Sequence, residues 1–184
     1  MNLLFRLFLT FNSTSFIIVV YLIKSQTVLN KFFHFLGKCP HFVSYTIYIF
    51  IPVVLTFLSL LATKYLDSDS IEAEAGKSAI VSIEQANNSF LPSYLGYFFV
   101  ALSVPSCETL IFIFAILFVF TFLSQTLYFN PIFLLFGYQF FYLTTENNIK
   151  IFLITKHDYK DSKRLSFPSL KRINDYTFID TKKR

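Results

Sequence analysis

Few side chains in this sequence could bind a metal or react with a substrate. His34, Cys39 and His41 lie close together and could offer two imidazoles and one thiolate to zinc. A structural zinc site needs four ligands, and no fourth ligand or supporting shell accompanies these three. The remaining histidine, His157, is far away in the chain. We therefore expect no metal site, and we interpret the group as loop residues at a membrane edge.

Catalytic and cofactor-binding motifs are also missing from the sequence. It contains no phosphate-binding loop and no G-x-G-x-x-G, C-x-x-C, H-E-x-x-H or G-x-S-x-G pattern. We expect a protein that is not an enzyme and that binds no cofactor.

The amino-acid composition is that of a membrane protein. Of the 184 residues, 54% are hydrophobic and 15% are charged, whereas an ordinary soluble domain has roughly 25% charged residues. The apolar residues form long uncharged runs that predict an α-helical integral membrane protein. The predicted transmembrane helices cover residues of about 7–23, 45–63, 91–106 and 110–127.

Two of these four spans have alternatives. The first could be a cleaved signal peptide, but no small-x-small cleavage site follows it, so we expect a retained helix. The third and fourth spans share a run, Leu91 to Leu127, that has a single charge, Glu108, and is too long for one helix. A helical hairpin with its turn at Pro105–Glu108 explains this run. If the weaker part, Leu91 to Val104, is a surface loop instead, only three spans remain.

Charge and strand patterns favour four spans. The transmembrane region, residues 1–128, has a polar loop at 64–90 of net charge −3, and the tail, residues 129–184, has a net charge of +5. Of the 16 Lys and Arg residues 10 follow Tyr128, which predicts a cytoplasmic tail. In the tail, Tyr138–Thr145 and Ile149–Lys156 predict a β-hairpin, and Ser78–Glu84 predicts a strand in the loop.

An isolated hairpin is marginally stable, so the loop strand is expected to complete a small cytoplasmic sheet. The loop and the tail lie on the same side of a membrane only with four spans, which also places the N-terminus in the cytoplasm. Opposite charges would then draw the loop and the tail together. In this topology Cys39 and Cys107 both lie outside, where they could pair, but nothing in the sequence fixes their separation and we expect free thiols.

Uncharged polar residues within the spans predict helix packing. Asn12 and Thr14 in the first span, and Ser124 and Gln125 in the fourth, are the candidates for hydrogen bonds between helices. No charged residue lies in the middle of a span, which disfavours an ion or substrate pathway. A pore lined by uncharged residues of an oligomer remains an alternative.

Basic and aromatic residues alternate in the tail in a pattern that suits an interaction surface, although the positive-inside rule accounts for much of the charge. Anionic lipid is a further candidate partner, and direct binding of nucleic acid is not expected. The residues proposed to bind a partner are Lys163, Arg164, Lys171, Arg172, Tyr176 and Phe178.

The segment Asn130–Tyr142, which leads into Ile151–Lys156, is expected to connect the last helix to the hairpin. Asn-Pro ends the helix at a membrane surface, Phe133–Phe136 anchor the chain there, and Gly137 turns the chain into the hairpin. This arrangement resembles the KwaA family, the small four-span membrane subunits of the bacterial Kiwa anti-phage defence system. Tyr94–Tyr97 in the third span is similar as well.

The resemblance implies a homo-oligomeric sensor of phage infection in the bacterial inner membrane, with a cytoplasmic effector partner of the KwaB type. Our hypothesis is a non-enzymatic adaptor that recruits this effector through loop 64–90 and the tail. The alternatives are a pore-forming or permeability-altering protein and a small transporter subunit.

Overall fold

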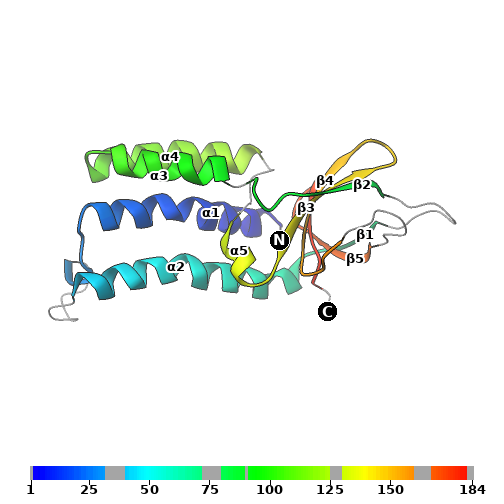
Figure 1. Ribbon diagram of the computed structural model, residues 1–184, viewed down its shortest axis with the longest axis horizontal. Helices are drawn as coiled ribbons and strands as arrows, with labels where there is room; N and C mark the ends of the chain where they lie inside the picture. The colour runs from blue at the N-terminus through cyan, green and yellow to red at the C-terminus, as the bar shows by residue number, and fades with distance from the viewer. Residues whose placement is uncertain are drawn as a thin grey trace.

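The computed structural model describes residues 2–31, 40–71, 80–89, 91–124, 130–159 and 167–181. Figure 1 shows an elongated molecule with a helical bundle at one end and a β-sheet at the other. The helix α1 packs against α2, α3 and α4, so it forms the centre of the bundle. The long helices are α1 (Asn2–Lys24), α2 (His41–Ala62), α3 (Leu91–Ser103) and α4 (Cys107–Ser124).

Three stretches are long and apolar enough to cross a membrane, namely Leu3–Lys24, His41–Tyr65 and Cys107–Ser124. They match three of the predicted spans, although the end of the predicted fourth span, beyond Ser124, lies outside the described residues. Short 3-10 turns follow α1 and α2, at η1 (Leu29–Lys31) and η3 (Thr63–Tyr65).

The helix α3 is shorter than the predicted span of residues 91–106. It has 13 residues and ends at Ser103, which gives a length of about 20 Å against the roughly 30 Å of a hydrocarbon core. Pro105 explains the early end, because its ring disfavours helical geometry at the preceding residue and it has no N–H to donate. A turn joins α3 and α4 as expected, but it covers residues 104–106, and Cys107 and Glu108 of the predicted turn belong to α4.

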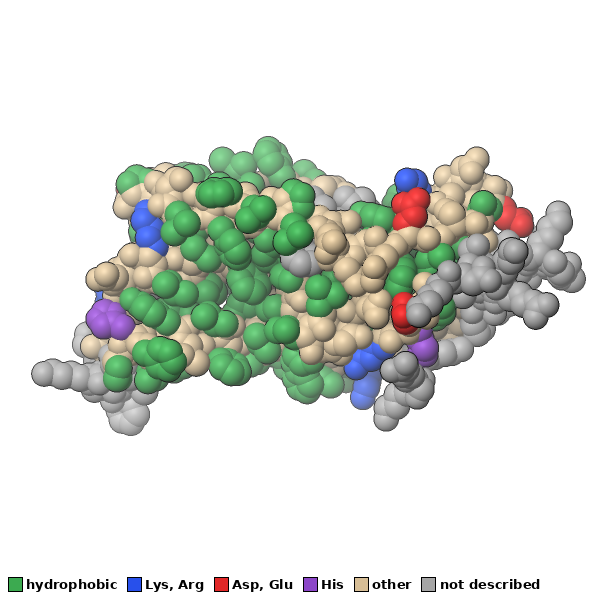
Figure 2. Space-filling model, in the orientation of Figure 1, with side chains coloured by type: hydrophobic (Ala, Val, Ile, Leu, Met, Phe, Trp, Pro, Cys, Tyr) green, Lys and Arg blue, Asp and Glu red, His purple; other side chains and the backbone are tan. Residues whose placement is uncertain are grey.

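Large apolar side chains are exposed along the outer helices. In Figure 2, hydrophobic side chains spread over the helical part of the visible face, and charged side chains lie towards the two ends of the molecule. Phe42, Phe50 and Phe57 of α2 and Phe112 and Phe120 of α4 are each at least half exposed. A surface of this kind is far more apolar than that of a soluble protein, which suggests a membrane protein.

The sheet has six strands in the order β1-β5-β6-β4-β3-β2. The pair β4 and β6 is parallel, and all other neighbours are antiparallel. The predicted hairpin is confirmed as β3 and β4, and the predicted loop strand is β2, which pairs with β3 as expected. The strands are β1 (Ser68–Ile71), β2 (Ile80–Gln85), β3 (Gln139–Thr145), β4 (Lys150–Thr155), β5 (Phe167–Arg172) and β6 (Thr177–Ile179).

Three strands were not expected from the sequence. The strand β1 lies in loop 64–90, and β5 and β6 lie in the part of the tail that was interpreted as a basic segment. The sequence signal of β1 and β5 is weak, because Ser-Asp-Ser-Ile is short and polar and Pro168 interrupts β5. Pairing with neighbouring strands therefore decides their conformation.

Side chains of the sheet alternate between two apolar cores. On one face Phe140, Phe152 and Ile154 pack with Phe5 and Leu9 of α1. This face therefore joins the sheet to the bundle at the end where α1 begins and α2 ends. The opposite face carries the second core, which consists of Ile80, Phe141, Leu143, Ile151, Leu153, Phe167, Leu170 and Phe178.

The segment from Asn130 to Gly137, which is predicted to anchor the chain at a membrane surface, is only partly exposed, with Leu135 at 77%. Asn130 and Phe133 are fully buried, and Phe133 belongs to the core between the sheet and α1. The segment forms the single turn α5 (Ile132–Leu135), which packs beside α2. Gly137 has φ 76°, as a residue that turns the chain requires.

Candidate functional site

The sheet brings together loop 64–90 and the tail, the two segments proposed to bind a partner. Lys171 and Arg172 lie at the end of β5, which pairs with β1 of the loop. Tyr176 lies in the turn between β5 and β6, and Phe178 lies in β6. Lys163 and Arg164 lie outside the described residues.

The basic side chains of β5 hold the loop and the tail together. The Lys171 ammonium donates to the Leu66 carbonyl at 2.9 Å and to the Ser68 hydroxyl at 2.8 Å. The Arg172 guanidinium donates to Asp175 and lies 3.8 Å from the carboxylate of Asp69 in β1. Opposite charges of loop and tail therefore meet, in a partly exposed ion pair that contributes little stability on its own.

Exposure separates the four described candidates for partner binding. Tyr176 is 50% exposed, whereas Phe178 is 5% exposed and belongs to the second core of the sheet. The Arg172 side chain is 42% exposed. Tyr176 thus retains the most surface for a partner, and Lys171 and Arg172 are partly exposed.

The candidates for helix packing differ in their hydrogen-bond partners. The Asn12 side-chain amide donates to the Thr56 hydroxyl of α2 at 2.8 Å, which is a hydrogen bond between helices. The hydroxyls of Thr14 and Ser124 instead donate to carbonyls of their own helices, at 2.9 and 3.0 Å. Gln125 lies outside the described residues.

Thr56 is the centre of a buried polar cluster that the sequence analysis missed. Its hydroxyl accepts from Asn12 and, at 3.0 Å, from the amide of Asn130, and it donates to the Pro52 carbonyl at 2.8 Å. All three polar side chains are essentially inaccessible. The packed face of α2 has a signal in the sequence, because small or polar residues recur about every four positions in an otherwise apolar run. These residues are Ser44, Tyr48, Pro52, Thr56, Ser59 and Thr63.

Two tyrosines of α3 extend the polar contacts of the bundle. The Tyr94 hydroxyl donates to the Ser13 carbonyl of α1 at 3.1 Å, and the Tyr97 hydroxyl lies 3.3 Å from the Thr121 hydroxyl of α4. Both tyrosines are buried. Tyr94 fastens α3 to α1, and Tyr97 fastens it to α4.

A second polar cluster joins the ends of the parallel strands β4 and β6. The Thr155 hydroxyl donates to the buried Asp180 carboxylate at 3.2 Å, and His157 Nδ1 lies 3.3 Å from the same oxygen. Burial raises the pKa of the Tyr159 phenol above its ordinary value, and Asp180 adds to this effect. The Thr155 hydroxyl also lies 3.5 Å from His157 Nδ1. Because this hydroxyl donates its proton to the Asp180 carboxylate, the cluster fastens two strands and does not resemble an activated nucleophile.

The residues weighed as metal ligands are only partly described. His34 and Cys39 lie outside the described residues, and the His41 ring contacts the Tyr45 hydroxyl at 3.3 Å. Within the ranges that the structure describes, no three His, Cys, Asp or Glu side chains are placed to hold a metal ion. Cys107 is exposed at the start of α4.

Comparison with known protein families identifies a match over nearly the whole chain. The family model described as "Anti-phage protein KwaA" matches residues 5–179, which is nearly the whole chain. No curated protein and no solved structure matches the chain.

Proposed function

Because the chain belongs to the KwaA family of anti-phage proteins, and so has a role in anti-phage defence, we propose that it acts there as a non-enzymatic membrane sensor and adaptor. In this proposal the helices anchor the protein in the inner membrane as a homo-oligomer. The sheet then recruits a cytoplasmic effector of the KwaB type through loop 64–90 and the tail.

The observation that carries this proposal is the composition of the sheet. Strands β1 and β2 come from loop 64–90, and the other four strands come from the tail. Between β2 and β3 the chain runs through α3 and α4 and returns to the same sheet. If α4 crosses the membrane, α3 must cross it as well, since the chain has to come back to the side from which it left.

The short helix α3 is compatible with such a crossing because the bundle supports it. Its Tyr94 reaches Ser13 in the middle of α1, and the Val104 carbonyl after its last turn accepts from Lys24 at the end of α1 at 2.6 Å. The hairpin turn thus lies level with the far end of α1. Four crossings place both termini, loop 64–90 and the sheet together, and the excess of positive charge in the tail favours the cytoplasmic side.

Partner recruitment is tested by co-purification from cells that produce the tagged full chain together with the effector. The double variant Arg172→Ala, Tyr176→Ala removes exposed side chains of the proposed surface, and we expect it to lower effector recovery at least about tenfold if these residues are interface anchors. Lys150→Ala removes an exposed cation of β4 and is the matched control.

Equal recovery with the double variant and the control would show that this surface does not bind the effector. If the wild-type chain recovers no effector but conducts ions in planar bilayers, the adaptor proposal fails and the pore alternative takes its place.

A further inference from the structure

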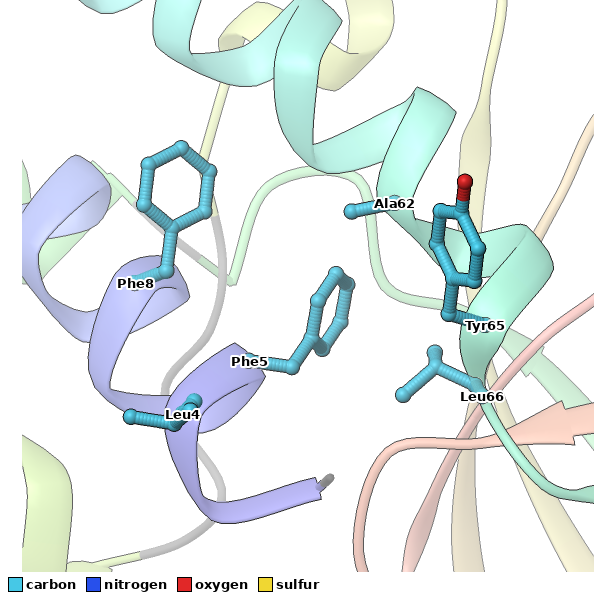
Figure 3. A pocket seen from close by; sticks show the side chains of 6 residues that line it. All are labelled: Leu4, Phe5, Phe8, Ala62, Tyr65 and Leu66. Carbon is cyan, nitrogen blue, oxygen red and sulfur yellow. The ribbon is translucent and has the colours of Figure 1, made fainter.

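An apolar cavity of about 280 Å³ opens where the bundle meets the sheet. In Figure 3 the Phe5 ring points towards Ala62, Tyr65 and Leu66, across the gap between the start of α1 and the end of α2. The cavity is lined by Leu4, Phe5, Phe8, Ala62, Tyr65 and Leu66.

A second cavity, of about 380 Å³, has a mostly polar lining that comes from α1, β1 and the turn after β5. Its lining includes Arg6 and Arg172 as cations and Asp67, Asp69 and Asp175 as anions. The side chains of this lining therefore carry a net charge of −1. Phe5 and Leu66 line the apolar cavity, and their chain neighbours Arg6 and Asp67 line the polar one, so the two cavities lie close together at the start of α1 and at the end of η3.

The lengths of two helices place these cavities at a membrane surface. A hydrocarbon core of about 30 Å corresponds to about 20 helical residues. Counted from Lys24 at the far end of α1, this distance ends near Leu4, and counted from His41 at the far end of α2 it ends near Leu61. Both counts reach the apolar cavity, and Tyr65 at its mouth is 71% exposed, as aromatic residues at lipid headgroups are.

We propose that the two cavities together bind one phospholipid with an ethanolamine headgroup. An acyl chain occupies the apolar cavity on the bundle side, and the headgroup occupies the polar cavity on the sheet side. The headgroup phosphate pairs with the guanidinium groups of Arg6 and Arg172, and its primary ammonium donates to the carboxylates of Asp69 and Asp175. These contacts replace part of the ion pairing that Arg172 makes with the same two carboxylates. Along the membrane normal, a phospholipid likewise has its acyl chains on the membrane side and its headgroup on the water side.

The charge of the polar cavity selects the headgroup. A phosphatidylglycerol headgroup brings a negative charge and no cation, so three carboxylates against two guanidinium groups disfavour it. An ethanolamine headgroup brings both charges and can satisfy both kinds of side chain. This site is separate from the basic tail residues for which anionic lipid was considered.

The test measures lipid retained by the purified full chain. The protein is exchanged into detergent that contains equal amounts of dioleoyl phosphatidylethanolamine and dioleoyl phosphatidylglycerol, and bound lipid is counted by native mass spectrometry. We expect the wild-type chain to retain phosphatidylethanolamine about tenfold over phosphatidylglycerol, the ratio that one charge-assisted hydrogen bond supplies.

Two variants separate the headgroup from the acyl chain. Asp69→Asn removes a carboxylate that is partly exposed, and we expect it to abolish the tenfold preference while the total lipid retained changes little. Ala62→Phe fills the apolar cavity, and we expect it to lower retention of both lipids. The controls are Glu84→Gln on β2 and Leu61→Phe on the exposed face of α2, both outside the two linings.

Equal retention of the two lipids by the wild-type chain overturns the proposal, and so does a preference that Asp69→Asn leaves unchanged. The inference rests on the proposed membrane setting, which is tested separately by fractionation of cells. A chain found in the soluble fraction contradicts the proposed function itself, whereas a membrane-bound chain without lipid preference contradicts this inference alone.

Discussion

At the residue scale, the buried hydroxyl of Thr56 links three segments of the chain. It accepts hydrogen bonds from Asn12 of α1 and from Asn130 of the segment before α5. Asn12 could be predicted as a helix-packing residue because a carboxamide in an apolar run needs a partner. Thr56 could not be singled out in the same way, because a threonine can satisfy its hydroxyl within its own helix.

Replacing Thr56 by valine keeps the shape of the side chain and leaves two buried amides without their acceptor. We expect the free energy of unfolding to fall by about 1–3 kcal/mol, the cost of buried donors that lose a partner. Unfolding by sodium dodecyl sulfate from mild detergent measures this change. The control is Thr46→Val, whose hydroxyl donates only to the Phe42 carbonyl of its own helix, and an equal loss in both variants would contradict the role of the cluster.

Glycine has a conformational role at one of two comparable positions. Gly137 has φ 76°, and Gly96 lies in α3, and a Cβ atom would meet nothing within 4 Å at either position. Gly137→Ala should therefore lower the free energy of unfolding by about 1–2 kcal/mol through backbone strain alone. Gly96→Ala should raise it by up to about 1 kcal/mol, since alanine favours the helix. Thermal unfolding compares the two variants, and the same sign for both would be inconsistent with this explanation.

At the element scale, the helices and strands that the sequence predicts are those with a strong local pattern. The β3–β4 hairpin is predictable because β-branched and aromatic residues surround the turn at Glu146–Asn148. The strand β2 is predictable from the partly alternating run Ser78–Glu84. The strands β1 and β5 were not, because their conformation depends on each other and on the contacts of Lys171. The predicted span of residues 91–106 ends three residues after α3, because an apolar run does not show where Pro105 disfavours helical geometry in the backbone before it.

Lys171 is expected to hold β1 on the sheet. Its ammonium donates to Leu66 and Ser68 at the start of that strand, and partly exposed contacts of this kind contribute about 1 kcal/mol. Lys171→Met should therefore speed amide hydrogen exchange in Ser68–Ile71 about fivefold, while exchange in β2 stays unchanged. Lys150→Met is the control, and a uniform acceleration over the whole sheet would indicate general destabilisation instead.

At the scale of the whole molecule, the helical bundle has an apolar surface that suits a membrane, and the sheet has a charged surface that suits water. The outer faces of α2 and α4 are apolar, whereas the charged groups among the described residues lie mainly on the sheet and at the far end of the bundle. Anchoring and partner recruitment can then occupy different parts of one short chain. The topology connects the bundle and the sheet, since the sheet is built from strands that precede and strands that follow the α3–α4 hairpin.

This topology predicts which cysteines a membrane-impermeant maleimide can reach in spheroplasts. In a Cys39→Ser background, the exposed Cys107 at the α3–α4 turn should be labelled before lysis. Single cysteines introduced at Val81 of β2 and at Tyr176, with Cys107→Ser, should be labelled only after lysis, although both positions are at least half exposed. With three spans Val81 would lie outside the membrane while Tyr176 lies in the cytoplasm, although both belong to the structure of one sheet. Labelling of Val81→Cys before lysis would therefore contradict four crossings.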